Sequence, residues 1–456
     1  YLIVKRFFMP PESQIIKLDA ISESLNSGAM LKAKLILNGL HPAEIARLLE
    51  SSPSRQRRLI WEMLDHKNDG EVLLEVGEEV RNNLMESMDD ESLLAATKGL
   101  DVDDLADLLD ELPETVVKQA LKGMDYQYRT RLEGVMNYDE DTAGGLMNTD
   151  TITIRPDVTL DVVLKYLRLR KEMPQNTDNI IVVDRYNHYL GTLSVTALLC
   201  ADPEKTVSES MDNDYISINA DTLANEVTNI FEDRDLVSAP VVDKNNILLG
   251  RITIDDVVDV IREESEHTVL NMAGLTDEED IFAPVLPSTR RRAIWLGINL
   301  LTALIASGVI SLFQETIEQV VALAVLMPIV ASMGGIAGSQ TLTLVIRGIA
   351  LGNISSTNSK SLLVKEISIG LLNSLLWACV IGVLSSYWFN NYLIGVVIGI
   401  AMIANLGFAA LSGVLIPIML KRIGVDPALG GGVILTTITD VIGFSSFLAL
   451  GTIFLL

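Results

Sequence analysis

Residues 429–456 read LGGGVILTTITDVIGFSSFLALGTIFLL, and Asp440 is the only charged residue in this run. The run exceeds the roughly 20 apolar residues that carry an α-helix across the ~30 Å hydrocarbon core of a bilayer. A charged side chain near the centre of such a helix costs about 2.5 to 3.5 kcal/mol to insert, so it is interpreted first as a functional group. This stretch therefore predicts a membrane-spanning helix with a functional carboxyl group near its middle.

Five apolar segments follow one another in the C-terminal part of the chain, over residues 293–313, 320–346, 367–385, 393–420 and 429–456. The basic residues of this part all fall on one side of the predicted spans: Arg290, Arg291, Arg292, Arg347, Lys360, Lys365, Lys421 and Arg422. Loops rich in Lys and Arg remain in the cytoplasm. The sequence therefore predicts a multi-pass protein of the cell (inner) membrane, in contact with lipid, with cytoplasmic N-terminal domains and an outside C-terminus.

Charge is divided unevenly between the two parts of the chain. The whole sequence has 35 Lys and Arg, 60 Asp and Glu and a formal net charge of −25. Residues 287–456 contain 8 of the basic and 5 of the acidic residues, which leaves 27 basic and 55 acidic residues, a net charge of −28, before them. Such an acidic body repels nucleic acid and favours cations. The two cysteines lie in different halves and residues 1–11 lack an apolar core, so neither a disulfide framework nor a secretory signal is predicted.

Two segments of the acidic body repeat at an offset of 60 residues, GLHPAEIARLLESSP at 39–53 and GLDVDDLADLLDELP at 99–113. Six positions are identical, and the apolar residues recur at the helical spacing i, i+3, i+4 before a proline. A repeat of this kind predicts stacked helical hairpins. We therefore expect an all-α solenoid from about residue 15 to about residue 135.

A second repeat begins after residue 141, where short β-branched runs alternate with helical segments. Residues 147–154 (MNTDTITI) correspond to 211–218 (MDNDYISI), and VVD at 182–184 corresponds to VVD at 241–243. Each copy has about 60 residues in the order strand, helix, two strands, helix, which is small for an independent core. The two copies are therefore expected to pack together.

The ending of each copy is similar to that of the cystathionine-β-synthase (CBS) module, which occurs in tandem and often binds adenine nucleotides. In the second copy, GRITIDD places Gly250, Thr253 and Asp256 where that module contacts ribose and phosphate. The first copy has Ala197 in place of the acid, so the resemblance implies one intact nucleotide half-site, with ATP as its candidate ligand. The alternative is that these residues only end a strand and cap the next helix.

Acidic residues at helical spacing are the candidate cation ligands of the body. Asp103 and Asp107 stand four apart in the second solenoid copy, and a later segment carries Asp256, Asp259, Glu263 and Glu264. Carboxylates at i and i+4 repel by roughly a few tenths of a kcal/mol unless a cation lies between them, and hard divalent cations prefer oxygen ligands. For any single acid a solvated helix face is the alternative. The set as a whole predicts metal binding, because a net charge of −28 opposes compaction unless counterions are bound.

The last apolar run supplies the candidate pore. Gly432, Thr436, Asp440 and Gly443 recur on one face at spacings of 4, 4 and 3, which places neutral oxygens beside one carboxylate. One carboxylate per chain supplies too few charged ligands for a dication. We therefore expect a homodimer whose two-fold axis pairs two Asp440 side chains around a hydrated Mg²⁺. The alternative is a carboxylate that bonds only to neighbouring threonines for helix packing.

With acidic helical repeats, two CBS-like copies and five spans, the sequence resembles the MgtE-type magnesium channels over nearly its whole length. The resemblance is carried by DTAGGLM at 141–147, SMGGIAGSQTLTLVIRG at 332–348, KRIGVDPAL at 421–429 and LTTITDVIGF at 435–444. That family is homodimeric, and an aspartate of its last span selects Mg²⁺, which the resemblance assigns to Asp440, with Thr436 as a pore neighbour.

The resemblance also implies regulation, because cytosolic Mg²⁺ closes the pore in that family. The positions that look like its regulatory ligands are Asp103, Asp107, Asp235, Asp256, Asp259, Glu264 and Asp426. The chain departs from the family pattern at Ile336 and Ser339, where Asn is familiar, and at His267, where an acid is expected. One regulatory site is therefore expected to be weaker or missing.

The sequence thus predicts an α-helical membrane protein of five transmembrane helices with a cytoplasmic all-α solenoid and α+β tandem CBS domains. We divide it into an acidic helical-repeat domain (1–138), two CBS domains (139–202 and 203–262), a connecting plug helix (263–289) and a membrane domain (290–456). The predicted function is non-enzymatic Mg²⁺ uptake down the electrochemical gradient, through a pore that cytosolic Mg²⁺ closes. A transition-metal exporter or proton-coupled antiporter and a signalling nucleotide sensor are the alternatives. Spans with no His and one Cys disfavour soft metals.

Overall fold

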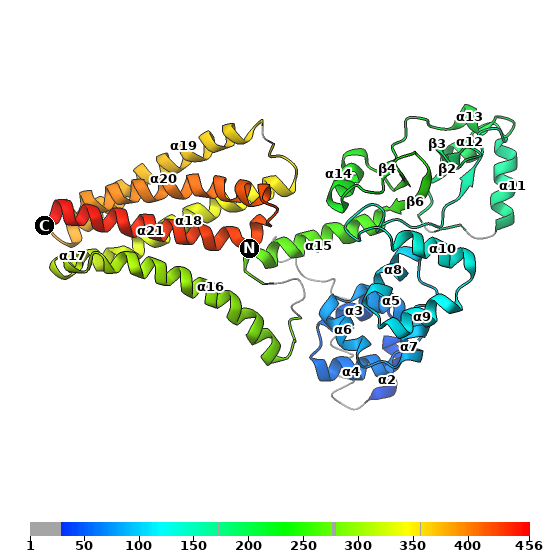
Figure 1. Cartoon of the computed structure of the whole chain (residues 1–456), viewed down its shortest axis with the longest axis horizontal. Coiled ribbons are helices and arrows are strands. Elements are labelled where there is room, and N and C mark those ends of the chain that lie inside the picture. Colours follow the sequence, from blue (N-terminus) through cyan, green and yellow to red (C-terminus); the bar gives the residue numbers. More distant parts are fainter. Residues whose placement is uncertain (1–28, 171–172, 175, 276–279, 356) are drawn as a thin grey trace. The chain divides into compact units, whose positions relative to one another are not determined.

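The computed structural model describes residues 29–170, 173–174, 176–275, 280–355 and 357–456 (Figure 1). The chain divides into two compact units. The first unit comprises residues 1–265 and 278–283, and the second comprises residues 266–277 and 284–456. Each unit has its own buried hydrophobic core.

Short helices form the N-terminal part of the first unit. They are α2 (Met30–Leu37), α3 (Pro42–Glu50), α4 (Ser54–Met63), α5 (Asp69–Glu75), α6 (Glu78–Met85), α7 (Asp90–Ala96), α8 (Val102–Glu111), α9 (Glu114–Gly123) and α10 (Tyr126–Val135). The two copies of the sequence repeat form α3 and α8. The all-α prediction is confirmed for the described residues, whereas residues 15–28 of the expected solenoid lie outside them.

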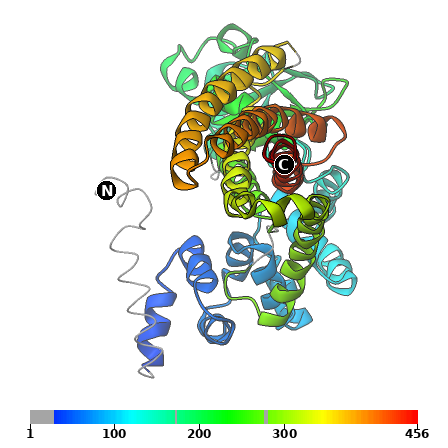
Figure 2. The same cartoon turned by 90° about the vertical axis from the view of Figure 1, so that its left-hand side faces the viewer.

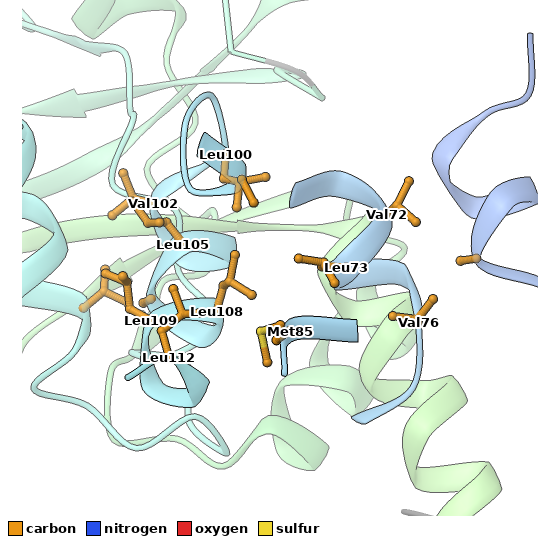
Figure 3. Close-up of a cluster of buried hydrophobic side chains, with 14 of the residues drawn as sticks. Val72, Leu73, Val76, Met85, Leu100, Val102, Leu105, Leu108, Leu109 and Leu112 are labelled. Atoms are coloured by element: carbon orange, nitrogen blue, oxygen red, sulfur yellow. The ribbon is translucent and has the colours of Figure 1, made fainter. Parts of the chain in front are cut away.

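The repeat has a structural reason in its prolines and its apolar face. Pro53 and Pro113 are the N-cap residues of α4 and α9, and a proline cannot continue the helix before it. Leu49 and Leu109 occupy equivalent places in the two copies and are both buried. In the shared core, Leu73 of α5 points toward Leu108 of α8 (Figure 3).

The rest of the first unit contains two three-stranded sheets. The first copy consists of β1 (Thr153–Ile154), α11 (Leu160–Arg170), β2 (Asn179–Val183), β3 (Tyr189–Ser194) and α12 (Val195–Cys200). The second, after the short α13 (Val207–Ser210), consists of β4 (Ile218–Asn219), α14 (Ala224–Arg234), β5 (Ser238–Val242), β6 (Leu248–Thr253) and the start of α15 (Ile254–Met272). In each sheet the first two strands are parallel and the last two antiparallel, in the order that the sequence predicts.

The two copies are joined by reciprocal backbone pairing. The segment that leads into the first copy pairs Asn148 with Arg251 of β6, and the segment that leads into the second copy pairs Asp212 with Thr192 of β3. Gly250 permits this approach, since a Cβ at that position would lie 2.7 Å from the Asn148 carbonyl oxygen. Each copy therefore completes the sheet edge of the other, which explains why the two pack as a pair.

A buried ion pair attaches residues 280–283 to the helical repeat within the first unit. Arg57 Nη1 of α4 lies 2.7 Å from Asp280 Oδ2, and the two side chains are only 4% and 3% exposed. The Asp280 backbone N–H donates to Glu79 Oε2 at 2.9 Å, and the Ser54 hydroxyl donates to the Phe282 carbonyl at 3.3 Å. The residues just before the first membrane helix are therefore held by α4 and α6.

Loss of this ion pair has a predictable cost. Arg57→Ala would leave the Asp280 carboxylate buried without its counter-charge, so we expect the first unit to lose about 3 to 5 kcal/mol of stability. Calorimetric unfolding of the full chain in detergent measures the effect as a lower midpoint for the first unit. Arg55→Ala, which removes an exposed arginine from the same helix, should leave the midpoint near that of the parent. Equal midpoints for the two variants would contradict the prediction.

Long apolar helices form most of the second unit. After the end of α15 come α16 (Val285–Ser311), α17 (Gln314–Gln319), α18 (Val321–Ala350), α19 (Ser359–Trp388), α20 (Tyr392–Arg422) and α21 (Pro427–Leu455). All of these except α17 are long and apolar enough to cross a membrane, with mean hydropathy between 1.8 and 2.3. The five predicted spans are therefore present as helices.

The structure differs from the sequence prediction at several boundaries. Residues 314–319, expected as a loop, form the short helix α17. The expected connecting helix at 263–289 is interrupted, because α15 ends at Met272 and Gly274 has φ +71 before α16 begins at Val285. Residues 276–279 of that segment lie outside the described residues. Several spans also extend past their predicted ends, because charged residues lower hydropathy without opposing a helix that leaves the membrane.

Helix α20 is the central element of the membrane unit. It packs against α18, α19 and α21, whose C-terminal end faces the viewer in Figure 2. Close packing depends on small residues, as is usual between membrane helices. Leu435 of α21 is fully buried against Gly338 of α18, where an added Cβ would lie 2.9 Å from the leucine. Gly338 therefore serves close contact between α18 and α21.

Candidate functional site

Asp440 is the fourteenth residue of α21 and lies near the middle of that helix. Its side chain is half-buried, while Thr436, one turn earlier, is exposed. The Thr436 hydroxyl donates to the carbonyls of Gly432 and Val433, both at 3.0 Å, so its lone pairs remain available to a ligand. Among the described residues, none makes a hydrogen bond or ion pair with the Asp440 carboxylate. The alternative of a carboxylate bonded to neighbouring threonines therefore finds no support within the described chain.

The predicted stripe of small and polar residues around Asp440 is only partly confirmed. Gly432, Thr436 and Asp440 lie on the half-exposed side of α21. Gly443 instead turns inward, where it is buried against Asn405 of α20 and Val330 of α18. On a regular helix Gly443 falls on the same side as the other three positions, so its burial comes from the packing of α18 and α20 against this turn of α21. The stripe therefore ends at Asp440.

The acids of the first unit gather around the start of α8. Asp103 is 8% exposed, and its Oδ1 accepts from Asn148 Nδ2 at 3.3 Å. Carboxylate oxygens of Asp101, Asp103 and Asp104 lie within 4.8 Å of one another, close enough to share one cation. Asp256, at the start of α15, is the strongest charged influence on Asp103. We call Asp101, Asp103, Asp104 and Asp256 the acidic cluster.

Burial raises the pKa of every member of the acidic cluster, and neighbouring acids add to the shift. Burial, followed by the charge of Asp256, raises the pKa of Asp103 to about 8. Burial raises the pKa of Asp256 to about 7, although hydrogen bonds from Thr253 oppose the shift, and burial with the Asp101 charge raises that of Asp104 to about 6. Burial also raises the pKa of Asp101. Carboxyl groups that hold protons near neutral pH are groups whose charge lacks compensation, which a bound cation would supply.

The other predicted ligands of the first unit are exposed residues. Asp107 is exposed as a whole residue, but its carboxyl group is partly desolvated, and this desolvation together with the nearby Glu140 charge raises its pKa to about 7. Asp259 is exposed and pairs with Arg262 at 3.5 Å. Glu263 and Glu264 are exposed on α15. Asp235 is the exposed C-cap of α14, with φ 52, and no described contact links it to the cluster.

Asp426 belongs to the second unit and already has two hydrogen-bond donors. Its Oδ1 accepts from the Ala428 backbone N–H at 2.9 Å, which makes it the N-cap of α21. Its Oδ2 accepts from the side-chain amide of Asn271 on α15 at 2.8 Å. His267 Nε2, at the position where an acid is expected, lies 2.9 Å from the same amide nitrogen. A metal at Asp426 would share the carboxylate with these two donors.

Thr253 and Asp256, the candidate nucleotide contacts, bond to each other in the structure. The Thr253 backbone N–H and the Thr253 hydroxyl both lie 3.1 Å from Asp256 Oδ2, and the hydroxyl also bonds to Asp255. This is helix-capping geometry at the start of α15. In the first copy Ser194 caps α12 differently, because its hydroxyl oxygen accepts from the Ala197 backbone N–H. The capping alternative is therefore the arrangement observed.

Three family models match the chain: the MgtE model, described as a divalent cation transporter, at residues 327–450, the MgtE intracellular N domain at 40–141, and the CBS domain at 143–204 and 207–263. The magnesium transporter MgtE of Thermus thermophilus is 29% identical over 96% of this chain and 98% of that protein. The magnesium transporter MgtE of Bacillus subtilis is 27% identical over 94% of this chain and 96% of that protein.

This chain belongs to the MgtE family.

A solved structure of the MgtE family is also similar to part of the chain. The cytosolic domain of the Mg²⁺ channel MgtE in complex with ATP is 29% identical to it, with a TM-score of 0.48. The match covers 53% of this chain and 99% of that one.

Several polar residues of this MgtE-family chain were not singled out from sequence. Asp101 and Asp104 flank Asp103, and the acidic run DVDDLADLLD could have indicated them. Glu366 lies in α19, 5% exposed, with Oε2 3.4 Å from the Thr341 hydroxyl of α18. It was missed because the predicted third span began one residue after it, whereas α19 begins at Ser359.

Proposed function

We propose that this chain is a Mg²⁺ channel that admits the ion down its electrochemical gradient and closes when Mg²⁺ binds its acidic cytoplasmic domains. The observation that carries the proposal is Asp440, a half-buried carboxylate without a described partner in the middle of an apolar helix. Such a group is costly in a membrane unless it meets a cation or water. Two relatives of nearly the same length, each named a magnesium transporter, support Mg²⁺ as the transported ion.

The pore requires two copies of the chain. One carboxylate neutralises only half the charge of a dication, so we place the Asp440 side chains of two protomers across a two-fold axis. Mg²⁺ gives up water reluctantly and demands octahedral geometry, which suits a hydrated ion between two carboxylates. The exposed Thr436 hydroxyl supplies a neutral oxygen one turn away.

Closure is assigned to the acidic cluster. When cytosolic Mg²⁺ is low, the uncompensated carboxylates of α8 and α15 repel one another. Bound Mg²⁺ joins Asp103 to Asp256, and with it the helical repeat to the helix that leads toward the membrane. The outlying acids Asp107, Asp259, Glu263 and Glu264 belong to the same proposal, as do Asp235 and Asp426 on grounds of resemblance alone.

The remaining assignments of the proposal concern place and ligands. The N-terminal domains face the cytoplasm and the C-terminus lies outside, because the basic residues flank the spans on one side. The domain limits at 138, 202, 262 and 289 stay as proposed. ATP at Thr253 and Asp256 rests on the family resemblance. These two residues bond to each other, so a nucleotide would have to replace that hydrogen bond, and no step of the mechanism uses ATP.

Flux in liposomes tests the function directly. The full chain, reconstituted with a Mg²⁺ indicator inside, should carry Mg²⁺ down its gradient at the same rate with and without a proton gradient. A rate that depends on the proton gradient would indicate an antiporter instead. Absence of Mg²⁺ flux with preserved ligand binding by the cytoplasmic domains would favour a sensor.

The raised pKa values predict that the stability of the first unit depends on pH. Folding an acid into a site that raises its pKa costs stability once the pH passes its unfolded pKa of about 4, and the loss continues up to the folded pKa of about 8 for Asp103. In EDTA the unfolding midpoint of the first unit should therefore fall as pH rises from about 5 to about 8. Saturating Mg²⁺ should remove most of this fall.

The same linkage between protons and stability determines how the Mg²⁺ affinity changes with pH. Mg²⁺ must displace more protons at pH 6 than at pH 8, so its apparent affinity should rise with pH, by about tenfold per pH unit for each proton displaced. Titration of the full chain by the shift in unfolding midpoint measures it. An affinity that is flat or falls with rising pH would contradict the assignment of Asp103 and Asp256.

A further inference from the structure

Asn405 of α20 is a buried polar residue at the junction of α18, α20 and α21. Its side chain is fully buried, and its Nδ2 donates to the Val330 carbonyl of α18 at 2.7 Å. That carbonyl is exposed to Asn405 because the next turn of α18 carries Gly334, where an added Cβ would lie 2.8 Å from Asn405 Cγ. Asn405 therefore fits only where α18 lacks a side chain.

The same amide also contacts α21. An added Cβ at Gly443 would lie 2.8 Å from Asn405 Nδ2, so the amide leaves no room for a side chain at this position. Eight residues earlier on α21, Leu435 is fully buried against Gly338 of α18. Asp440 lies between these two contacts. The rotation of α21, and with it the direction of the Asp440 side chain, is therefore fixed from both sides.

The Asn405 amide lowers the stability of the helix bundle if its role is packing alone. Asn405 Oδ1 is buried and has no hydrogen-bond donor among the described residues. An unsatisfied buried oxygen destabilises a bundle, and a leucine of similar size would avoid that cost. A single buried Asn at a helix contact is known to fix register at the expense of stability. The arrangement therefore indicates positional specificity.

We infer that Asn405 is the positioning residue of the pore: its hydrogen bond to the Val330 carbonyl and its contact with Gly443 hold α21 at the rotation that presents Asp440 to the ion. The expected effect on conduction rests on the proposed function. Mg²⁺ tolerates only near-octahedral oxygen geometry, whereas Ca²⁺ accepts six to eight ligands in flexible arrangements. A loosened α21 therefore harms Mg²⁺ conduction more than Ca²⁺ conduction.

The test measures the ratio of Mg²⁺ to Ca²⁺ flux in liposomes for the full chain. Asn405→Leu keeps the volume and removes the donor, so the ratio should fall about tenfold, the equivalent of one interhelical hydrogen bond. Asn405→Asp should keep the ratio within about twofold, because a carboxyl held neutral by burial still donates to the Val330 carbonyl. Gly407→Ala, on the same helix with open space around it, is the matched control.

A second measurement does not depend on transport. Gly334→Ala should lower the unfolding midpoint of the membrane unit in the parent, where the new methyl group meets Asn405, and much less in an Asn405→Ala background. Equal effects in both backgrounds would overturn the inferred contact, and a folded Asn405→Leu chain with the parent's flux ratio would overturn its positioning role. A parent chain that carries no Mg²⁺ would contradict the proposed function, and the unfolding cycle would still decide the contact.

Discussion

Asp440→Ala is expected to reduce Mg²⁺ flux in liposomes by at least about 100-fold. Removal of one member of a buried charge pair costs about 3 to 5 kcal/mol, and each 1.4 kcal/mol is a factor of ten in rate. In a two-fold pore the substitution removes both carboxylates at once, so the hydrated ion would meet only hydroxyl and carbonyl oxygens. Asp440→Asn should be nearly as severe, because it preserves the shape of the side chain but not its charge.

The matched control for this substitution is Glu315→Gln. Glu315 is an exposed acid on α17, outside the long helices, and its loss removes the same charge from the second unit. Its flux should stay within about twofold of the parent, because a solvated surface charge is screened. If Asp440→Ala conducts as well as Glu315→Gln, the carboxylate does not line the ion path and the pore assignment is wrong.

Asp103→Ala combined with Asp256→Ala is expected to leave the channel open at Mg²⁺ concentrations that close the parent. The two residues come from α8 and α15, and the charge of Asp256 adds to the burial that raises the pKa of Asp103. Removal of both takes away the carboxylates through which a bound ion would join those helices. The half-closing Mg²⁺ concentration should rise by about 5- to 150-fold, the usual range of coupling between sites.

Flux measured against the Mg²⁺ concentration on the cytoplasmic side provides the readout. Asp90→Asn is the control, since it removes an exposed acid in the first turn of α7 within the same domain. Its closing curve should superimpose on that of the parent. The double variant should also keep its maximal flux, because it leaves Asp440 untouched. An unchanged half-closing concentration would show that the cluster is not the sensor.

The sequence predicted the elements well where local chemistry sufficed. The five spans follow from apolar length, and the two solenoid copies follow from helical spacing before Pro53 and Pro113. The paired CBS copies were likewise expected from repeated strand patterns. Element ends were less accurate, because charges such as Lys360 and Lys365 lower hydropathy without ending a helix. The break at Gly274 was missed, since one glycine in an otherwise helical pattern is tolerated.

The candidate sites were identified only in part, because some of their features are local and others depend on contacts between distant segments. Asp440 could be identified because a carboxylate in a long apolar run is evident from the sequence alone. The role of Asp426 as the N-cap bonded to Asn271 could not, because 155 residues separate the two side chains. Glu366 escaped notice at the edge of a predicted span, although the fold buries it beside Thr341.

The amino-acid sequence by itself determined that the chain has an acidic body, five apolar helices and one carboxyl group in the last of them, because transfer free energies and helix periodicity are properties of a single segment. Only the tertiary structure decided which acids crowd around Asp103, that Gly443 turns inward, and that Asn405 lies between α18 and α21. Those facts depend on burial and charge shared between segments far apart in the chain, and such energies exist only once the segments are in contact.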